Sequence, residues 1–209
     1  MAITVRVTGL DRALRGVKNA PRQIRYAATL AVNETAKALQ QHTISTLLPS
    51  AFTLRSRGAP WWKPGTRYGF NIRFARRTQP EPFAILGSRA DWLYLQEEGG
   101  TKTASSGRSL AVPQIGTARK SPGAYIQRWA KPANLLRRDI AFTQSGRRGR
   151  LLFTRRKKHR YPITLWYGFE RSASIKPVLH FGRVEGALAR RLLPLEFERG
   201  LRTALATAK

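Results

Sequence analysis

With 209 residues the chain can form one domain with a substantial core, and without cysteine it can form neither disulfides nor cysteine-based metal sites. Its 39 Lys and Arg residues against 11 Asp and Glu give a formal net charge of +28, which opposes compaction and favours an anionic partner, either nucleic acid or an acidic protein. No apolar run reaches the roughly 18 residues of a membrane span and the N-terminus lacks the apolar centre of a secretory signal, so we expect a soluble protein made in a cytoplasm.

The first 49 residues predict one strand followed by two helices. Residues 3–7 alternate apolar and polar side chains, as an edge strand does, and residues 10–18 have the spacing of a short helix. Pro21 suits the first turn of a second, longer helix that runs to about Leu48, where Pro49 ends it. Small and apolar side chains recur on one face of this helix, so it should pack closely against a sheet. That face consists of Ile24, Ala28, Ala31, Thr35 and Leu39.

Residues 50–121 predict strands and long loops. Between 50 and 79, basic residues are mixed with aromatic ones, which fits either a stacking platform for single-stranded nucleic acid or a loop and strand (68–75) with buried rings. Burial is the simpler interpretation, against the core or against a neighbouring subunit. Trp61 and Trp62 are therefore candidates for a subunit interface.

The next elements predicted are short. Residues 82–87 form an apolar strand, and Asp91 is placed to cap a helical turn that stops at Gly99 in a left-handed conformation. The composition of residues 102–108 predicts a flexible polar loop, and residues 110–112 resume the sheet.

Residues 122–169 predict a β-meander with strongly basic connections. Strands at 139–144 and 150–154 pair around a turn, and a third strand continues to Phe169, with Ile163, Leu165 and Tyr167 on the same side as Phe169. Eight of the fourteen residues from 147 to 160 are basic and none is acidic, so we expect these connections to contact DNA or an acidic partner. The candidates are Arg147, Arg148, Arg150, Arg155, Arg156, Lys157, Lys158 and Arg160.

Residues 170–209 predict helix with one interruption. The apolar stripe that precedes Pro194 is displaced from the stripe made by Phe197, Leu201 and Leu205. A proline inside a helix removes a hydrogen bond and costs about 3 kcal/mol, so we expect two helical segments at an angle. Pro194, Phe197 and Leu201 are candidates for a subunit interface.

The residues that could support catalysis have unsuitable spacing. A metal-dependent nuclease of the restriction-endonuclease type needs Asp followed by Glu-x-Lys, whereas three residues separate Glu98 from Lys102. The three histidines are far apart, and the chain contains neither a phosphate-binding glycine loop nor a nucleophile elbow. We therefore expect no enzymatic activity, no metal and no cofactor.

Several short motifs occur in the same order as in a phage protein family. Residues 122–127 (PGAYIQ), 150–153 (RLLF), 160–163 (RYPI) and 193–197 (LPLEF) resemble the minor tail protein Z family of lambda-like phages, whose members complete the head-proximal end of a long tail. The N-terminal order of a strand, Gly9-Leu10 and two helices is similar too, whereas residues 50–109 match little.

The resemblance implies a structural subunit of the virion, present as a six-fold ring at the end of the tail tube. Its implied partners are other copies of itself, the tail tube or tail terminator protein, the head–tail connector protein and packaged double-stranded DNA, with no membrane. The charge alone supports a second hypothesis equally well: a non-enzymatic, basic nucleic-acid-binding protein of the ribosomal or DNA-packaging type. Against this alternative, the chain contains no RNP-type aromatic motif, zinc finger or clear helix-turn-helix.

The predicted fold class is α+β, because helical and strand patterns are segregated along the chain. We expect a single domain, residues 1–209, in which a mostly antiparallel, twisted sheet is packed by the long N-terminal helix and a bent C-terminal helical pair. Its parts are strand and helices at 1–49, strands and long loops at 50–121, the basic meander at 122–169 and C-terminal helices at 170–209.

Overall fold

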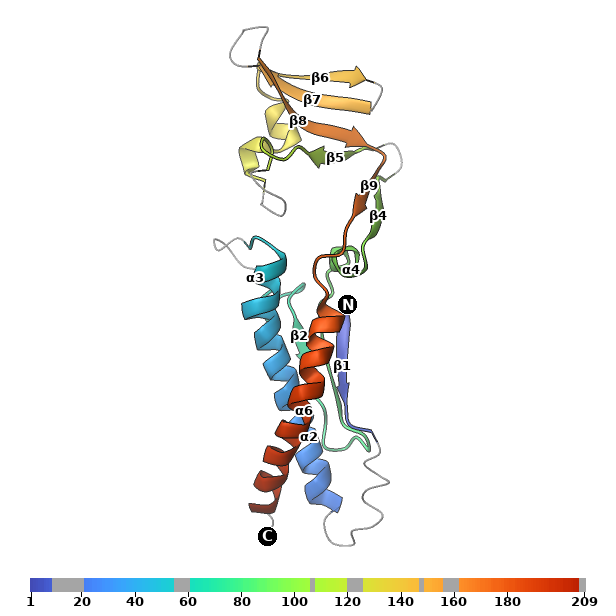
Figure 1. Ribbon diagram of the computed structural model, residues 1–209, viewed down its shortest axis with the longest axis vertical. Coiled ribbons are helices and arrows are strands. Elements are labelled where there is room, and N and C mark those ends of the chain that lie inside the picture. The colour runs from blue at the N-terminus through green and yellow to red at the C-terminus, as the bar shows by residue number, and fades with distance from the viewer. Residues whose placement is uncertain are drawn as a thin grey trace.

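The molecule is elongated, with helices at one end and a β-sheet at the other (Figure 1). The computed structural model describes residues 1–8, 21–54, 61–105, 108–119, 126–146, 149–155 and 162–206. Its helices and antiparallel sheets confirm the predicted α+β class, but three separate sheets replace the single sheet expected. We refer to the described residues of 1–98 and 176–206 as the body, to β4 and β9 as the ribbon, and to the described residues of 104–171 as the head. The predicted helix at 10–18 lies outside the described residues.

A small antiparallel sheet supports the helices of the body. It consists of β1 (Ala2–Arg6), β2 (Asn71–Arg73) and β3 (Phe83–Gly87) in the order β1-β3-β2. The predicted edge strand is thus β1 and the predicted apolar strand is the central β3, whereas the strand expected at 68–75 is limited to three residues. Val5 lies opposite Ala84, and both side chains are buried in the body core.

The long N-terminal helix buries the face that the sequence indicates. α2 (Pro21–His42) continues through one π-helical segment (Thr43–Leu47) into α3 (Leu48–Ala51). Ala28, Ala31, Thr35 and Leu39 are almost fully buried. Pro49 does not end the helix at once, because α3 continues through it to Ala51.

The C-terminal helix is continuous, which corrects the expected helical pair. α6 runs from Phe181 to Ala206 with Pro194 inside it. Pro194 is exposed, so the proline ring does not disturb the helix–helix interface. On either side of it, Leu188 and Phe197 pack against hydrophobic clusters to which α2 contributes. This packing along α2 offsets the local cost of the proline (Figure 1).

A short helix leads into the ribbon. α4 (Trp92–Glu98) ends at Gly99 as predicted, but only the φ of 73° fits a left-handed stop, because the ψ of −169° lies outside the left-handed helical region. The side chain of Asp91 makes no capping hydrogen bond. The next residues form β4 (Gly100–Thr103), which pairs with β9 (Ser172–Ile175). Part of the loop expected at 102–108 is therefore a strand.

Glu97 connects α4 to the start of α6. Its two carboxylate oxygens accept the backbone N–H groups of Phe181 (2.6 Å) and Gly182 (2.7 Å). A carboxylate here satisfies free N–H groups and complements the positive end of the helix dipole. Glu97 thus has a structural role.

The head contains the predicted meander. Its strands are β5 (Leu110–Pro113), β6 (Ala141–Gly146), β7 (Gly149–Arg155) and β8 (Ile163–Glu170), in the order β5-β8-β7-β6. A 3-10 turn (Arg128–Ala130) and α5 (Pro132–Leu135) cover one face. A register shift opposite Leu152 and Phe153 leaves Trp166 as an extra residue in β8. Because of this bulge, Ile163 and Leu165 lie on the opposite face from Tyr167 and Phe169, not on the same face as expected.

Candidate partner-binding surface on the head

The head is the most one-sidedly charged part of the chain. From residue 110 to residue 170 the sequence has fourteen basic residues and two acidic ones, Asp139 and Glu170. Such a surplus attracts polyanions and repels other copies of the same surface. The head is therefore the part of the chain most suited to contact an anionic partner.

Two of the eight predicted contact residues lie in the part of the chain that the structure describes. Arg150 and Arg155 are both exposed, near opposite ends of β7. At 3.3 Å per residue, the seven-residue strand separates its two ends by roughly 20 Å. A ligand that meets both ends must therefore extend across the sheet. The other six candidates, Arg147, Arg148, Arg156, Lys157, Lys158 and Arg160, lie outside the described residues.

Arg150 and Arg155 also belong to different faces of the sheet. The guanidinium of Arg150 donates a hydrogen bond to the Thr143 hydroxyl (2.9 Å) on the face covered by α5. The guanidinium of Arg155 lies over the ring of Phe142, 4.4 Å from its centroid, on the other face. The basic residues therefore do not form one continuous patch on β7.

The covered face forms the small core of the head. Leu135, Leu152 and Tyr167 are buried there, and the Tyr167 hydroxyl donates to the carbonyl of Ala130 (2.8 Å). Burial raises the pKa of the Tyr167 phenol, and the positive charge of Arg119 partly opposes that rise. The phenol therefore stays protonated and holds the 3-10 turn against the sheet.

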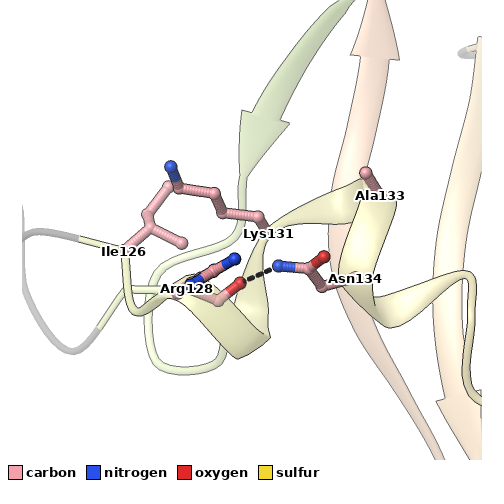
Figure 2. A pocket seen from close by; sticks show the side chains of 5 residues that line it. All are labelled: Ile126, Arg128, Lys131, Ala133 and Asn134. Carbon is pink, nitrogen blue, oxygen red and sulfur yellow. Dashed lines mark hydrogen bonds between the residues drawn. The ribbon is translucent and has the colours of Figure 1, made fainter.

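An open pocket of about 580 Å³ lies beside this turn (Figure 2). Arg128 and Lys131 line it together with Ile126, Ala133 and Asn134. The Asn134 amide donates to the carbonyl of Arg128 (2.5 Å), which fixes the backbone between the two cations. The ion pairs found among the described residues include neither Arg128 nor Lys131, so both charges can meet an external anion.

Trp129, next to the pocket, is poorly suited to stack on a base. It is 45% exposed, but Arg138 lies over its ring at 5.3 Å and Trp166 meets it edge to face at 5.6 Å. These neighbours leave less ring surface than a stacking platform needs. The pocket is therefore suited to phosphate or carboxylate groups more than to bases.

The second face of the head sheet, which we call the open face, is mostly apolar. The strand register places seven apolar side chains on it, and the rings of Phe142 and Phe153 are stacked with their centroids 5.6 Å apart. The seven residues are Leu110, Val112, Phe142, Leu151, Phe153, Ile163 and Leu165. Among the described residues, none of the seven belongs to a buried hydrophobic cluster.

The predicted interface residues lie on the body. Trp61 and Trp62 are half-buried against its core, and Trp61 also contacts Trp92, with ring centroids 4.7 Å apart. Pro194 is exposed, whereas Phe197 and Leu201 are half-buried on α6. Contact of these residues with a second subunit stays a prediction.

A buried carboxylate between α2 and α6 was not predicted from the sequence. Glu185 is fully buried, and its Oε1 lies 2.9 Å from both the Nδ1 of His42 and the hydroxyl of Thr43. The other oxygen, Oε2, has no hydrogen-bond partner among the described residues. Only the spacing of Glu185 within the apolar positions of α6 could have indicated its burial.

The chain was compared with protein-family models, curated proteins and solved structures, and it matches none of them. None of the helices that the structure describes is both long enough and apolar enough to cross a membrane.

Proposed function

We propose that this protein is a structural, non-enzymatic subunit of a virion that completes the head-proximal end of a long phage tail. The observation that carries the proposal is the division of the molecule into a helical body and a strongly basic head joined by a narrow ribbon (Figure 1). The order of the motifs that resemble the minor tail protein Z family supports the same role.

The division suggests separate tasks for the two ends. The body, with its close-packed helices, suits contacts between copies in a six-fold ring and with the tail tube or terminator protein. The basic head of the protein suits contact with the packaged double-stranded DNA and with the head–tail connector, at the point where they meet the tail. No step of this role needs a catalytic group or a cofactor.

Removing the gene from the phage that encodes it tests the proposal. We expect infected cells to accumulate tails that fail to give infectious particles, and we expect the intact gene supplied in trans to restore them. Electron microscopy of purified tails should show the protein as a ring at one end. Normal tails and normal infectivity would instead favour the alternative of a nucleic-acid-binding protein outside the virion.

The contribution of the basic connection after β7 can be tested separately. Replacing Arg155, Arg156, Lys157 and Lys158 together with Gln should weaken binding to duplex DNA and reduce the log–log salt slope by about 0.9 for each phosphate that the variant no longer neutralises. Tails carrying this variant should form but fail to hold or deliver DNA normally. DNA binding is measured by fluorescence anisotropy at several salt concentrations.

A control variant that removes the same number of positive charges elsewhere shows whether DNA binding depends on this connection or only on the net charge of the protein. Arg22, Arg183, Arg190 and Arg191 are exposed on the helices of the body, so changing all four to Gln removes equal charge far from the head. We expect DNA binding by this control variant to keep most of the wild-type dependence on salt concentration. Equal slopes for the two quadruple variants would rule out the connection as the anionic contact.

A further inference from the structure

We propose that the open face of the head sheet binds a protein surface with an apolar centre and acidic surroundings. The proposal deepens the proposed function by naming the kind of partner that the head meets, and it rests on that function for its biological setting. Two features support it: the apolar residues on both faces of one sheet, and the net positive charge of the head sequence.

The residue pattern of β7 is that of a strand covered on both faces. Leu151, Leu152 and Phe153 are consecutive apolar residues, whereas a strand with one face in water usually alternates apolar and polar residues. On the covered face Leu152 is 0% exposed. On the open face Leu151 and Phe153 keep part of their surface accessible, as do the neighbours they pair with.

The apolar residues of the open face are continuous across all four strands. Phe153 lies between Phe142 of β6 and Leu165 of β8, and Val112 of β5 and Leu151 of β7 both lie opposite Gly168 of β8. Ile163 adds a side chain that is 41% exposed. A contiguous apolar area of this kind, left uncovered by the rest of the described chain, marks an interaction surface.

The chemistry of the open face excludes nucleic acid as its main ligand. Arg155 is the basic side chain on this face among the described strand residues, and it is already placed over Phe142. Glu170 shares the face, with its carboxylate near Gly168, so the described strand residues give the open face no surplus of positive charge for a chain of phosphates. Phe142 and Phe153 stack on each other, so their rings are not free for bases.

The charge of the head also argues against a second copy of this chain as the occupant. Two heads packed face to face would bring together two sets of fourteen basic residues with only two acidic residues each. A partner with acidic residues around an apolar centre avoids this repulsion and complements the net positive charge of the head sequence. Phenylalanine and arginine are also enriched where protein interfaces bury most of their surface.

A labelled peptide can test this proposal with the full-length protein. The probe is a fluorescein-labelled peptide of alternating Glu and Leu, which presents an acidic edge and an apolar face, and its block-sequence isomer is the control peptide. We expect wild-type protein to bind the alternating peptide at least tenfold more tightly than the isomer at physiological salt. Equal binding of the two peptides would overturn the proposal, because net charge alone would then explain it.

Matched variants locate the binding site. Phe153→Gln with Leu165→Gln should weaken peptide binding at least tenfold and change duplex DNA binding less than twofold. Val178→Gln with Leu195→Gln alters two exposed apolar residues of the body, 44% and 53% exposed, and should change neither. Val112→Gln on the edge strand β5 provides a milder variant if the double variant fails to fold by circular dichroism, and it should weaken peptide binding at least threefold.

Three further results would contradict the proposal. Unchanged peptide binding by the folded open-face variant would place the peptide elsewhere, and an equal loss of DNA binding would make the open face part of a nucleic-acid site. A wild-type dimer that the open-face variant converts to monomers would identify a second copy as the occupant. The peptide assay uses the isolated protein, so a negative result would contradict the binding site on the open face but not the role in the tail. Normal tails in the absence of the gene would contradict the role in the tail but not the binding site.

Discussion

Replacing His42 with alanine should lower the free energy of unfolding by about 1–3 kcal/mol, because it leaves a buried carboxyl group without one of its hydrogen-bond partners. Glu185 is fully buried, and the Nδ1 of His42 lies 2.9 Å from its Oε1. Thr43 remains as the other hydrogen-bond partner of the same oxygen, and it does not replace the hydrogen bond that His42 makes. Urea denaturation followed by circular dichroism at 222 nm measures the change, since α2 and α6 dominate that signal.

Two further variants define the cause of this loss. His42→Ala combined with Glu185→Leu should recover most of the stability, because no buried carboxyl group with an unmade hydrogen bond is then left in the core. Gln41→Ala, at the exposed neighbouring position, should change stability by no more than about 0.5 kcal/mol. If the double variant is as unstable as His42→Ala, poorer packing and not the lost hydrogen bond of the Glu185 carboxyl group is responsible.

Gly200→Leu should lower the free energy of unfolding by about 3 kcal/mol, because α2 and α6 come too close at this point to accept a side chain. A Cβ atom on Gly200 would lie 2.8 Å from the carbonyl oxygen of Ala27 and 3.3 Å from its Cα. Both are backbone atoms, so a side-chain rotation cannot relieve the overlap, and the two helices must move apart. Thermal and urea denaturation both report the effect.

Gly186 provides the matched control on the same helix. A Cβ atom there meets nothing within 4 Å, so Gly186→Leu removes a flexible residue from a helix without a clash. We expect it to stabilise the protein by roughly 0.5–1 kcal/mol. Destabilisation by both variants to a similar extent would show that the added leucine side chain disturbs this helix wherever it stands, and that the close approach at Gly200 is not the cause.

The elements that could be predicted from the sequence are those with a local pattern. The buried face of α2 follows from small residues at helical spacing, and β3, β6, β7 and β8 follow from apolar strand patterns between turns. The ribbon was missed because Gly100–Thr103 is polar and Ser172–Ile175 is only four residues long, and their mutual pairing makes them strands. The bulge at Trp166 was missed because a large apolar residue fits either face of a sheet.

The density of basic residues in the sequence indicated the candidate surface, but the division of that surface into two sheet faces and a pocket depends on the tertiary structure. Arg150 and Arg155 could be named as exposed basic residues, yet their assignment to opposite faces depends on the register of β7. The pocket between Arg128 and Lys131 needs the turn that Asn134 stabilises. The pair of His42 and Glu185 joins residues 143 positions apart, and no local signal connects them.

The ribbon gives the chain the topology of one domain inserted into another. Thr103, where the chain leaves β4, lies opposite Ser172, where it enters β9, and the N–H of Ala104 donates to the carbonyl of Arg171 (2.8 Å). The whole head is thus a cassette whose two ends are neighbours, so a tight hairpin turn between β4 and β9 could replace it without rerouting the body. In evolution, related chains could exchange this cassette and acquire new partners while the framework that holds it is retained.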